Sequence, residues 1–161
     1  MSSRKNILLF LALLFPGLIF VMLKIFGRNQ FDVEPLFQTS IPDFASQCGK
    51  AAVPYHIPDS VLNKLSMEDD SLVCIHFDPG SDEANAQLQR AVEEFAKDPV
   101  KITSSNKLTH PSWKECIFYL KEPFDLVLVD REGTIRGQYV AADRDEMDRM
   151  ITEITILLKK Y

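Results

Sequence analysis

The chain has 161 residues, of which 18 are lysine or arginine and 23 are aspartate or glutamate, so its formal net charge is −5. That length has room for one domain with appendages. The charge is unevenly distributed: the first 30 residues hold four basic and no acidic side chains, which leaves 14 − 23 = −9 for the rest. So acidic a globular part argues against nucleic acid as a partner, because its phosphates would repel the protein.

The first expected element is an unbroken apolar segment over residues 7–23. About 17–20 such residues suffice to cross a hydrocarbon core ~30 Å thick. The segment is longer than the core of a signal peptide and no small-residue cleavage site follows it, so we predict an uncleaved transmembrane anchor over residues 1–28. A cleaved signal peptide and a buried soluble helix are the alternatives. Arg4 and Lys5 give a slight positive-inside bias, which places the globular part on the extracytoplasmic, periplasmic side of the membrane.

Residues 29–58 are predicted to form an extended stalk. They are rich in proline, serine, glutamine and phenylalanine, and they show no sustained helical or strand period. Such a segment is expected to run along the domain and to pack a few aromatic side chains on it, namely Phe31, Phe37, Phe44 and Tyr55.

The domain predicted over residues 59–161 has its first strand at Ser71–Phe77, whose continuous apolar run is typical of a strand covered on both faces. Ser81 then has the place of a helix N-cap, and Asp82 and Glu83 lie at the positive end of the dipole of the helix that follows. The remaining elements of this half are a short strand at Val100–Thr103 and a helix at Ser112–Leu120.

The C-terminal part contains a hairpin and a closing helix. Leu126–Val129 is an apolar strand, Asp130–Gly133 is a tight turn, and Thr134–Val140 is the return strand. In the last helix Asp143 and Glu146 have the spacing of a capping box. The apolar stripe of this helix consists of Met147, Met150, Ile151, Ile154, Leu157 and Leu158. The complete order of elements suits a small mixed sheet with helices on both faces.

Three segments carry a family resemblance: YHIPD at residues 55–59, LVDREGTIRGQY at residues 128–139 and DEMDRMITEITILLK at residues 145–159. Together with the apolar N-terminus they resemble the Sco/SenC family, which comprises membrane-anchored copper chaperones for cytochrome oxidase. The resemblance implies an α/β fold of thioredoxin-like type, with a mixed sheet between helices on both faces and one transmembrane helix before it.

The metal site that the resemblance implies is missing from this chain. Sco/SenC proteins place a C-x-x-x-C pair in the turn between the first central strand and the next helix, and a distant histidine completes the Cu(I) site. Soft thiolates suit Cu(I), and the helix N-terminus lowers their pKa. Residues 76–84 of this chain contain no cysteine, and Glu122 has the place of the histidine. We therefore expect no cofactor, no catalytic residue and no metal at the usual location.

A rebuilt metal site is the alternative. Cys74 and His76 are two residues apart on one expected strand, so their side chains share a face. Cys116, His110 or Glu122 would then be the third ligand. The competing interpretation is packing, because a cysteine in an apolar strand usually behaves as a small buried hydrophobe.

The cysteines Cys48, Cys74 and Cys116 are odd in number and form no C-x-x-C pair, which argues against a disulfide framework. Because Cys48 falls in the predicted stalk, we expect it to be an exposed thiol. Pro123 directly precedes the FDLVLVD strand and resembles the cis-proline that flanks the active site in thioredoxin folds. A cis peptide bond is therefore expected at Pro123.

These features predict a membrane-anchored, non-enzymatic thioredoxin-like protein. It would act as a binding module or accessory subunit of an envelope membrane complex, and the resemblance implies a respiratory oxidase or its assembly machinery. Its partners would be other membrane or envelope proteins. The alternative is a copper or redox metallochaperone of Sco type with a rebuilt ligand set, which copper titration would distinguish from the first hypothesis.

Overall fold

The computed structural model of the chain describes residues 14–22, 24, 32–49, 51–65, 71–78, 80–105 and 112–159. Its contacts divide the chain into two units, Met1–Phe31 and Asp32–Tyr161. Residues 32–58 of the predicted stalk thus belong to the same unit as the sheet.

In the first unit, residues 14–22 are helical and their large apolar side chains are exposed. No helix among the described residues is both long enough and apolar enough to cross a membrane. Apart from these residues and Lys24, the anchor predicted over residues 1–28 lies outside the described part of the chain. The transmembrane anchor therefore stays a prediction from the sequence.

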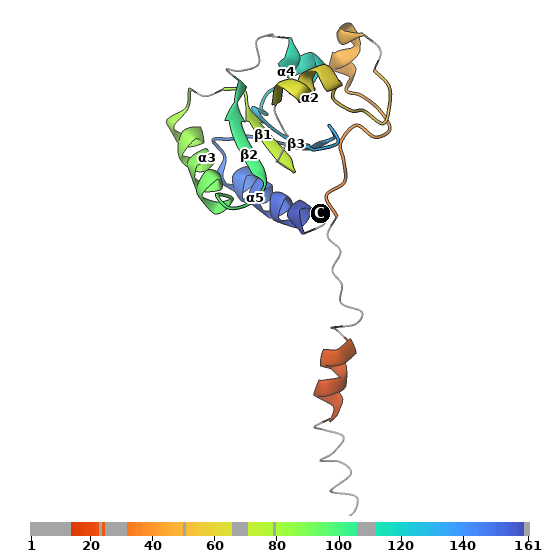
Figure 1. The fold of residues 1–161 in the computed structure, drawn as a ribbon, viewed down its shortest axis with the longest axis vertical. Helices are drawn as coiled ribbons and strands as arrows, with labels where there is room; N and C mark the ends of the chain where they lie inside the picture. The colour runs from red at the N-terminus through yellow and green to blue at the C-terminus, as the bar shows by residue number, and fades with distance from the viewer. Residues whose placement is uncertain are drawn as a thin grey trace, which may run out of the picture. The chain divides into compact units, whose positions relative to one another are not determined.

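The second unit is built on one four-stranded sheet with the strand order β2-β1-β3-β4 (Figure 1). The strands are β1 at Leu72–His76, β2 at Val100–Ser104, β3 at Leu126–Asp130 and β4 at Ile135–Tyr139. β1 pairs in parallel with β2 and antiparallel with β3, and β3 pairs antiparallel with β4. The predicted α/β class with a mixed sheet is confirmed.

The two central strands are buried on both faces. Every residue of β1 and β3 is buried. Because side chains alternate along a strand, Leu72 and Cys74 face one hydrophobic core, whereas Val73 and Ile75 face a second core on the other side of the sheet. The domain therefore needs a cover on each face.

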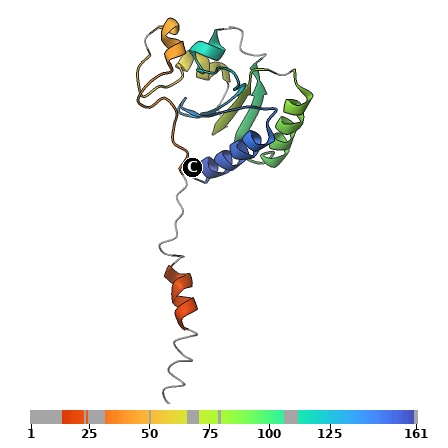
Figure 2. The same ribbon diagram turned by 180° about the vertical axis from the view of Figure 1, so that it is seen from behind.

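Helices α3 (Asp82–Glu94) and α5 (Arg144–Leu158) cover the face that Leu72 and Cys74 share, as Figures 1 and 2 show from opposite sides. Both predicted N-caps are present. The Ser81 hydroxyl accepts from the N–H of Ala84 at 3.3 Å, and the carboxylate of Asp143 accepts from the N–H of Asp145 at 2.8 Å. Four residues of the predicted apolar stripe of α5 are fully buried, namely Met147, Met150, Ile154 and Leu157.

The other face has a cover of three short elements: the 3-10 helix η1 at Asp43–Cys48, α2 at Asp59–Leu65 and α4 at Trp113–Cys116. The helix predicted over Ser112–Leu120 is thus shorter than expected. Phe118, Tyr119 and Leu120 are consecutive and all buried, which one face of an amphipathic helix cannot achieve. Tyr119 has a φ of 47°, so the chain leaves the helical conformation there. α2 and η1 are not predicted from the sequence.

The turn between β3 and β4 is held by the buried carboxylate of Asp130. One of its oxygens accepts from the N–H of Glu132 at 3.0 Å and from that of Thr134 at 2.8 Å. The other oxygen accepts from Arg136 Nε at 2.7 Å. Gly133, with a φ of 80°, supplies the left-handed conformation that the turn requires. The predicted hairpin is confirmed.

We expect Ile154→Ala to lower the free energy of unfolding by about 2–5 kcal/mol, because Ile154 is fully buried between α5 and the sheet and the truncation leaves a cavity. The exposed Thr152→Ala in the same helix is the control, with an expected change within about 0.5 kcal/mol. Urea unfolding followed by circular dichroism measures both. Equal effects of the two substitutions would contradict the packing described for α5.

Candidate functional site

The first candidate site lies at the end of β1, where the sequence places the turn into α3. His76 is the last residue of β1, and its side chain is 2% exposed. Its Nε2 atom is buried and has no hydrogen-bond partner among the described residues. The nearest acidic group is Asp125, whose Oδ2 lies 3.7 Å from that nitrogen. This distance permits an electrostatic interaction but is too long for a hydrogen bond.

Asp125 is held in place from the opposite side. Its Oδ1 accepts from the backbone N–H of Ala141 at 2.7 Å, which joins the chain before β3 to the chain after β4. Burial by itself acts to raise the pKa of Asp125, but the neighbouring His76 and the N–H of Ala141 outweigh it. The pKa of Asp125 therefore lies below its ordinary value of 3.8.

The residues after β1 cap the helix. Ser81 bonds both the N–H of Ala84 and, at 3.1 Å, the carboxylate of Glu83. The backbone N–H of Glu83 and the Ser81 hydroxyl lower the pKa of the Glu83 carboxyl group. Asp82, Glu83 and Glu122 are all exposed. Within the described ranges, no three histidine, cysteine, aspartate or glutamate side chains are grouped so that they could hold a metal ion.

Pro123 lies between Glu122 and the start of β3. The structure has the Glu122–Pro123 peptide bond in the cis form, which is the form expected for Pro123 from the resemblance. A second cis bond, which the sequence analysis does not predict, joins Val53 to Pro54.

Cys74 is fully buried in the middle of β1. Its Sγ donates to Met150 Sδ of α5 at 3.3 Å, and burial raises the pKa of the Cys74 thiol to about 12. Because the thiolate is the form that attacks disulfides and binds metals, burial of this thiol disfavours both roles at Cys74. Cys116 is not available as the third ligand of the alternative metal site, because it is bonded to another cysteine. His110, the second candidate for that place, lies outside the described residues.

That other cysteine is Cys48. The two sulfurs form a disulfide with a Cα–Cα distance of 5.3 Å, across a sequence separation of 68 residues. The expectation that Cys48 is an exposed thiol is therefore wrong, and so is the expectation that the cysteines form no disulfide within the chain. Each residue looks unpaired in the sequence because its partner is so far away in the chain, and only the docking of η1 against α4 brings the two together.

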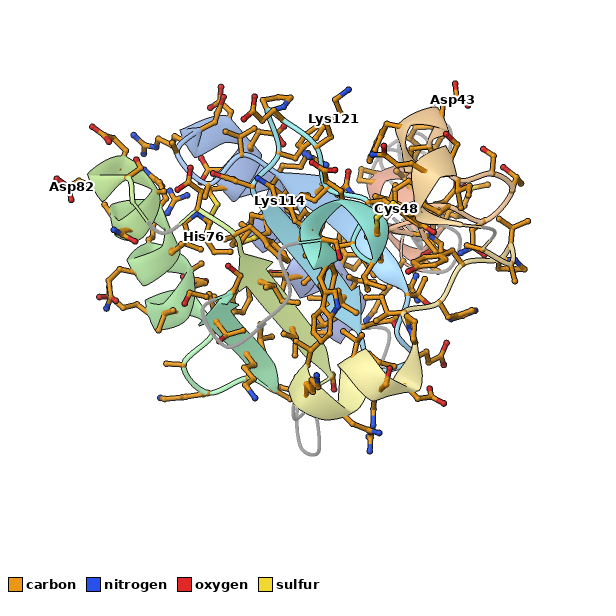
Figure 3. All side chains as sticks on the ribbon, turned by 90° about the horizontal axis from the view of Figure 1, so that it is seen from above. Asp43, Cys48, His76, Asp82, Lys114 and Lys121 are labelled. Atoms are coloured by element: carbon orange, nitrogen blue, oxygen red, sulfur yellow. A yellow bond between two sulfur atoms is a disulfide. The ribbon has the colours of Figure 1, made fainter. Side chains whose placement is uncertain are left out.

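The disulfide lines the second candidate site, a cleft of about 420 Å³. Figure 3 shows Cys48 beside α4, separate from His76 and from Asp82 of α3. The lining comes from the end of η1, from the linker between η1 and α2, and from the end of α4 with the residues that follow it. The lining residues are Cys48, Gly49, Ala51, Ala52, Pro54, Tyr55, His56, Pro58, Cys116, Ile117 and Tyr119.

Aromatic side chains stiffen the base of this cleft. The Tyr55 and Tyr119 rings lie 4.5 Å apart between centroids, and Phe37 packs edge-on against Tyr119 at 5.2 Å. The Tyr55 hydroxyl donates to the carbonyl of Ile117 at 2.8 Å. Phe37 and Tyr119 both have positive φ angles, 59° and 47°. Such conformations persist only where surrounding contacts fix them, so the base of the cleft is a firmly held part of the domain.

Asp125→Asn should weaken the domain in a pH-dependent way. Because the folded-state pKa of Asp125 is depressed, its carboxylate stabilises the fold above the ordinary pKa, and this contribution disappears as the pH falls through the folded-state pKa. Asparagine keeps the acceptor for the N–H of Ala141. The unfolding free energies of variant and wild type should differ near ~pH 7 and converge toward ~pH 2–3. The exposed Asp98→Asn is the control, and a pH-independent difference for Asp125→Asn would contradict the role of its charge.

Removing the disulfide should cost roughly 4 kcal/mol of stability, as expected from the chain entropy of a loop of this length. The test is the double variant Cys48→Ala/Cys116→Ala, unfolded with urea with and without reductant. Wild type with reductant should approach the double variant, whose own unfolding should not respond to reductant. If reductant leaves the wild-type midpoint unchanged while the bond is open, the cross-link does not stabilise the domain.

No protein-family model matches the chain, and no curated protein matches it at a significant level. The resemblance to the Sco/SenC family therefore stays a prediction from residues 55–59 and 126–161. What the protein does must be inferred from the sheet, the end of β1 and the disulfide cleft.

Proposed function

We propose that Asp32–Tyr161 is a thioredoxin-like domain that acts as a non-catalytic binding module. In this proposal the N-terminal apolar segment anchors the chain in a membrane and the domain lies on the extracytoplasmic side. The protein would be an accessory subunit of an envelope membrane complex, with a respiratory oxidase or its assembly machinery as the complex that the resemblance suggests.

The observation that carries the proposal is the sheet order β2-β1-β3-β4 combined with the composition of the turn after β1. A parallel β1–β2 pair joined by α3, followed by the β3–β4 hairpin and α5, is the arrangement expected of a thioredoxin-like domain. In such a domain a reactive thiol would lie at the start of the helix after β1, where the dipole stabilises its thiolate. In this chain residues 77–84 contain no cysteine.

The chemistry of the sulfurs supports the same proposal. Cys74 is buried, with a raised pKa, and Cys48 and Cys116 are cross-linked away from the end of β1. Stable disulfides form in oxidising compartments and are rare in the cytosol. A cross-link between residues so far apart therefore favours an extracytoplasmic domain over a cytoplasmic one.

The absence of copper chemistry can be tested directly. Purified full-length protein should hold no stoichiometric Cu(I) in an anaerobic competition with a chromophoric Cu(I) chelator, because carboxylates are hard ligands that compete poorly for this soft ion. Cys74→Ser serves as the matched variant and should give the same titration as the wild type. If the wild type holds one copper tightly per chain and Cys74→Ser does not, the binding-module proposal is contradicted. The protein would then be a metallochaperone with a rebuilt ligand set.

Binding is tested in the membrane itself. Affinity-tagged full-length protein, solubilised in mild detergent, should migrate on native gels as part of an assembly that contains other membrane proteins in fixed proportion. Removal of residues 1–28 should release the domain from the membrane fraction. A chain that migrates alone after cross-linking in intact membranes would contradict the assignment as an accessory subunit.

A further inference from the structure

The disulfide is placed where an external thiol can reach it. Cys48 is the last residue of η1 and Cys116 is the last residue of α4, and both are only half-buried. Both line the open cleft. Because thiol–disulfide exchange requires a thiolate to approach one of the two sulfurs directly, access decides whether a disulfide can react. A structural disulfide sealed in a core lacks this access.

Among the described residues, the segment that the disulfide holds, residues 38–54, has backbone hydrogen bonds to the rest of the domain only at its base. The N–H of Tyr55 donates to the carbonyl of Phe37 at 3.1 Å and closes the base, and the N–H of Leu36 donates to the carbonyl of Ile135 at 2.8 Å. In the described part of residues 39–54, no backbone hydrogen bond joins the segment to the sheet or to α4. The disulfide, the contact of Phe44 with Lys121 and apolar packing on the second core hold it in place; the packed residues are Ile41, Phe44, Ala45 and Ala51.

We propose that the Cys48–Cys116 disulfide is a reversible thiol–disulfide exchange site whose substrate is a dithiol, and that its reduction releases residues 38–54 and opens the cleft. The thiolate of the dithiol attacks one sulfur, the sulfur–sulfur bond breaks, and the other cysteine leaves as a thiolate that takes a proton from water. The second thiol of the substrate then attacks the mixed disulfide. The substrate is oxidised to a disulfide, and the protein gains two electrons and two protons.

The change is confined to one part of the cleft lining. The released segment contributes five of the lining residues, namely Cys48, Gly49, Ala51, Ala52 and Pro54. The base stays in place, because the hydrogen bond from Tyr55 to Ile117 and the packing of Tyr55 on Tyr119 do not depend on the disulfide. Because α2 and the buried residues Phe118–Leu120 still cover the second core after reduction, the cleft changes shape without requiring the sheet to unfold.

The test uses the full-length oxidised protein, dithiothreitol as the dithiol and no denaturant. Acid quenching followed by a maleimide of high mass counts the free thiols, circular dichroism follows the fold, and chymotrypsin probes the bond between Phe44 and Ala45. Cys74→Ala is the control that assigns the new thiols to the pair. Cys48→Ser/Cys116→Ser is the variant in which residues 38–54 are permanently released.

We expect dithiothreitol to expose the two thiols of the pair while the circular dichroism spectrum is unchanged. Cleavage after Phe44 should accelerate by about tenfold or more, since cleavage follows the population of the open form. The double-serine variant should be cleaved at that rate without reductant; if this variant does not fold, reduced wild type alone decides. The proposal is overturned if the thiols appear only at urea concentrations that unfold the sheet, or if reduction leaves cleavage after Phe44 unchanged.

Discussion

The fold depends on one constraint, which is the burial of β1 and β3 on both faces. All ten residues of the two strands are buried, and the apolar side chains among them alternate between two separate hydrophobic cores. A sheet that is apolar on both sides is stable only when each side has its own cover. The rest of the domain can be understood as the way in which the chain provides these two covers.

The two covers are built differently. The first consists of α3 and α5, which are long enough to present a continuous apolar stripe and carry side-chain N-caps. The second consists of η1, α2 and α4, none longer than seven residues. Helices so short gain little from their own hydrogen bonds. Cross-links between distant segments therefore hold the second cover, and these include the disulfide and the hydrogen bond from the Tyr55 hydroxyl to the carbonyl of Ile117 at 2.8 Å.

This difference explains what could be predicted from the sequence. The strands, the hairpin and the caps Ser81 and Asp143 depend on residues close together in the chain, so local patterns predict them. The disulfide depends on two residues 68 positions apart, and no local pattern reports that η1 docks on α4. The premature end of α4 has the same origin, because tertiary packing buries Phe118, Tyr119 and Leu120 together and overrides the helical period.

The different construction of the two covers also affects which part of the domain can change its structure when it binds or reacts. At the end of β1 the buried His76 lies beside Asp125, whose carboxylate is tied to the N–H of Ala141, so polar groups there link the strands rather than face solvent. The second cover, in contrast, is made of loops and short helices, and it brings a cleft and both sulfurs of the disulfide to the surface. Loops on a rigid scaffold can change without disturbing the core beneath them. A binding or exchange function is therefore better accommodated by this cover than by the sheet end, where any rearrangement would disturb both central strands.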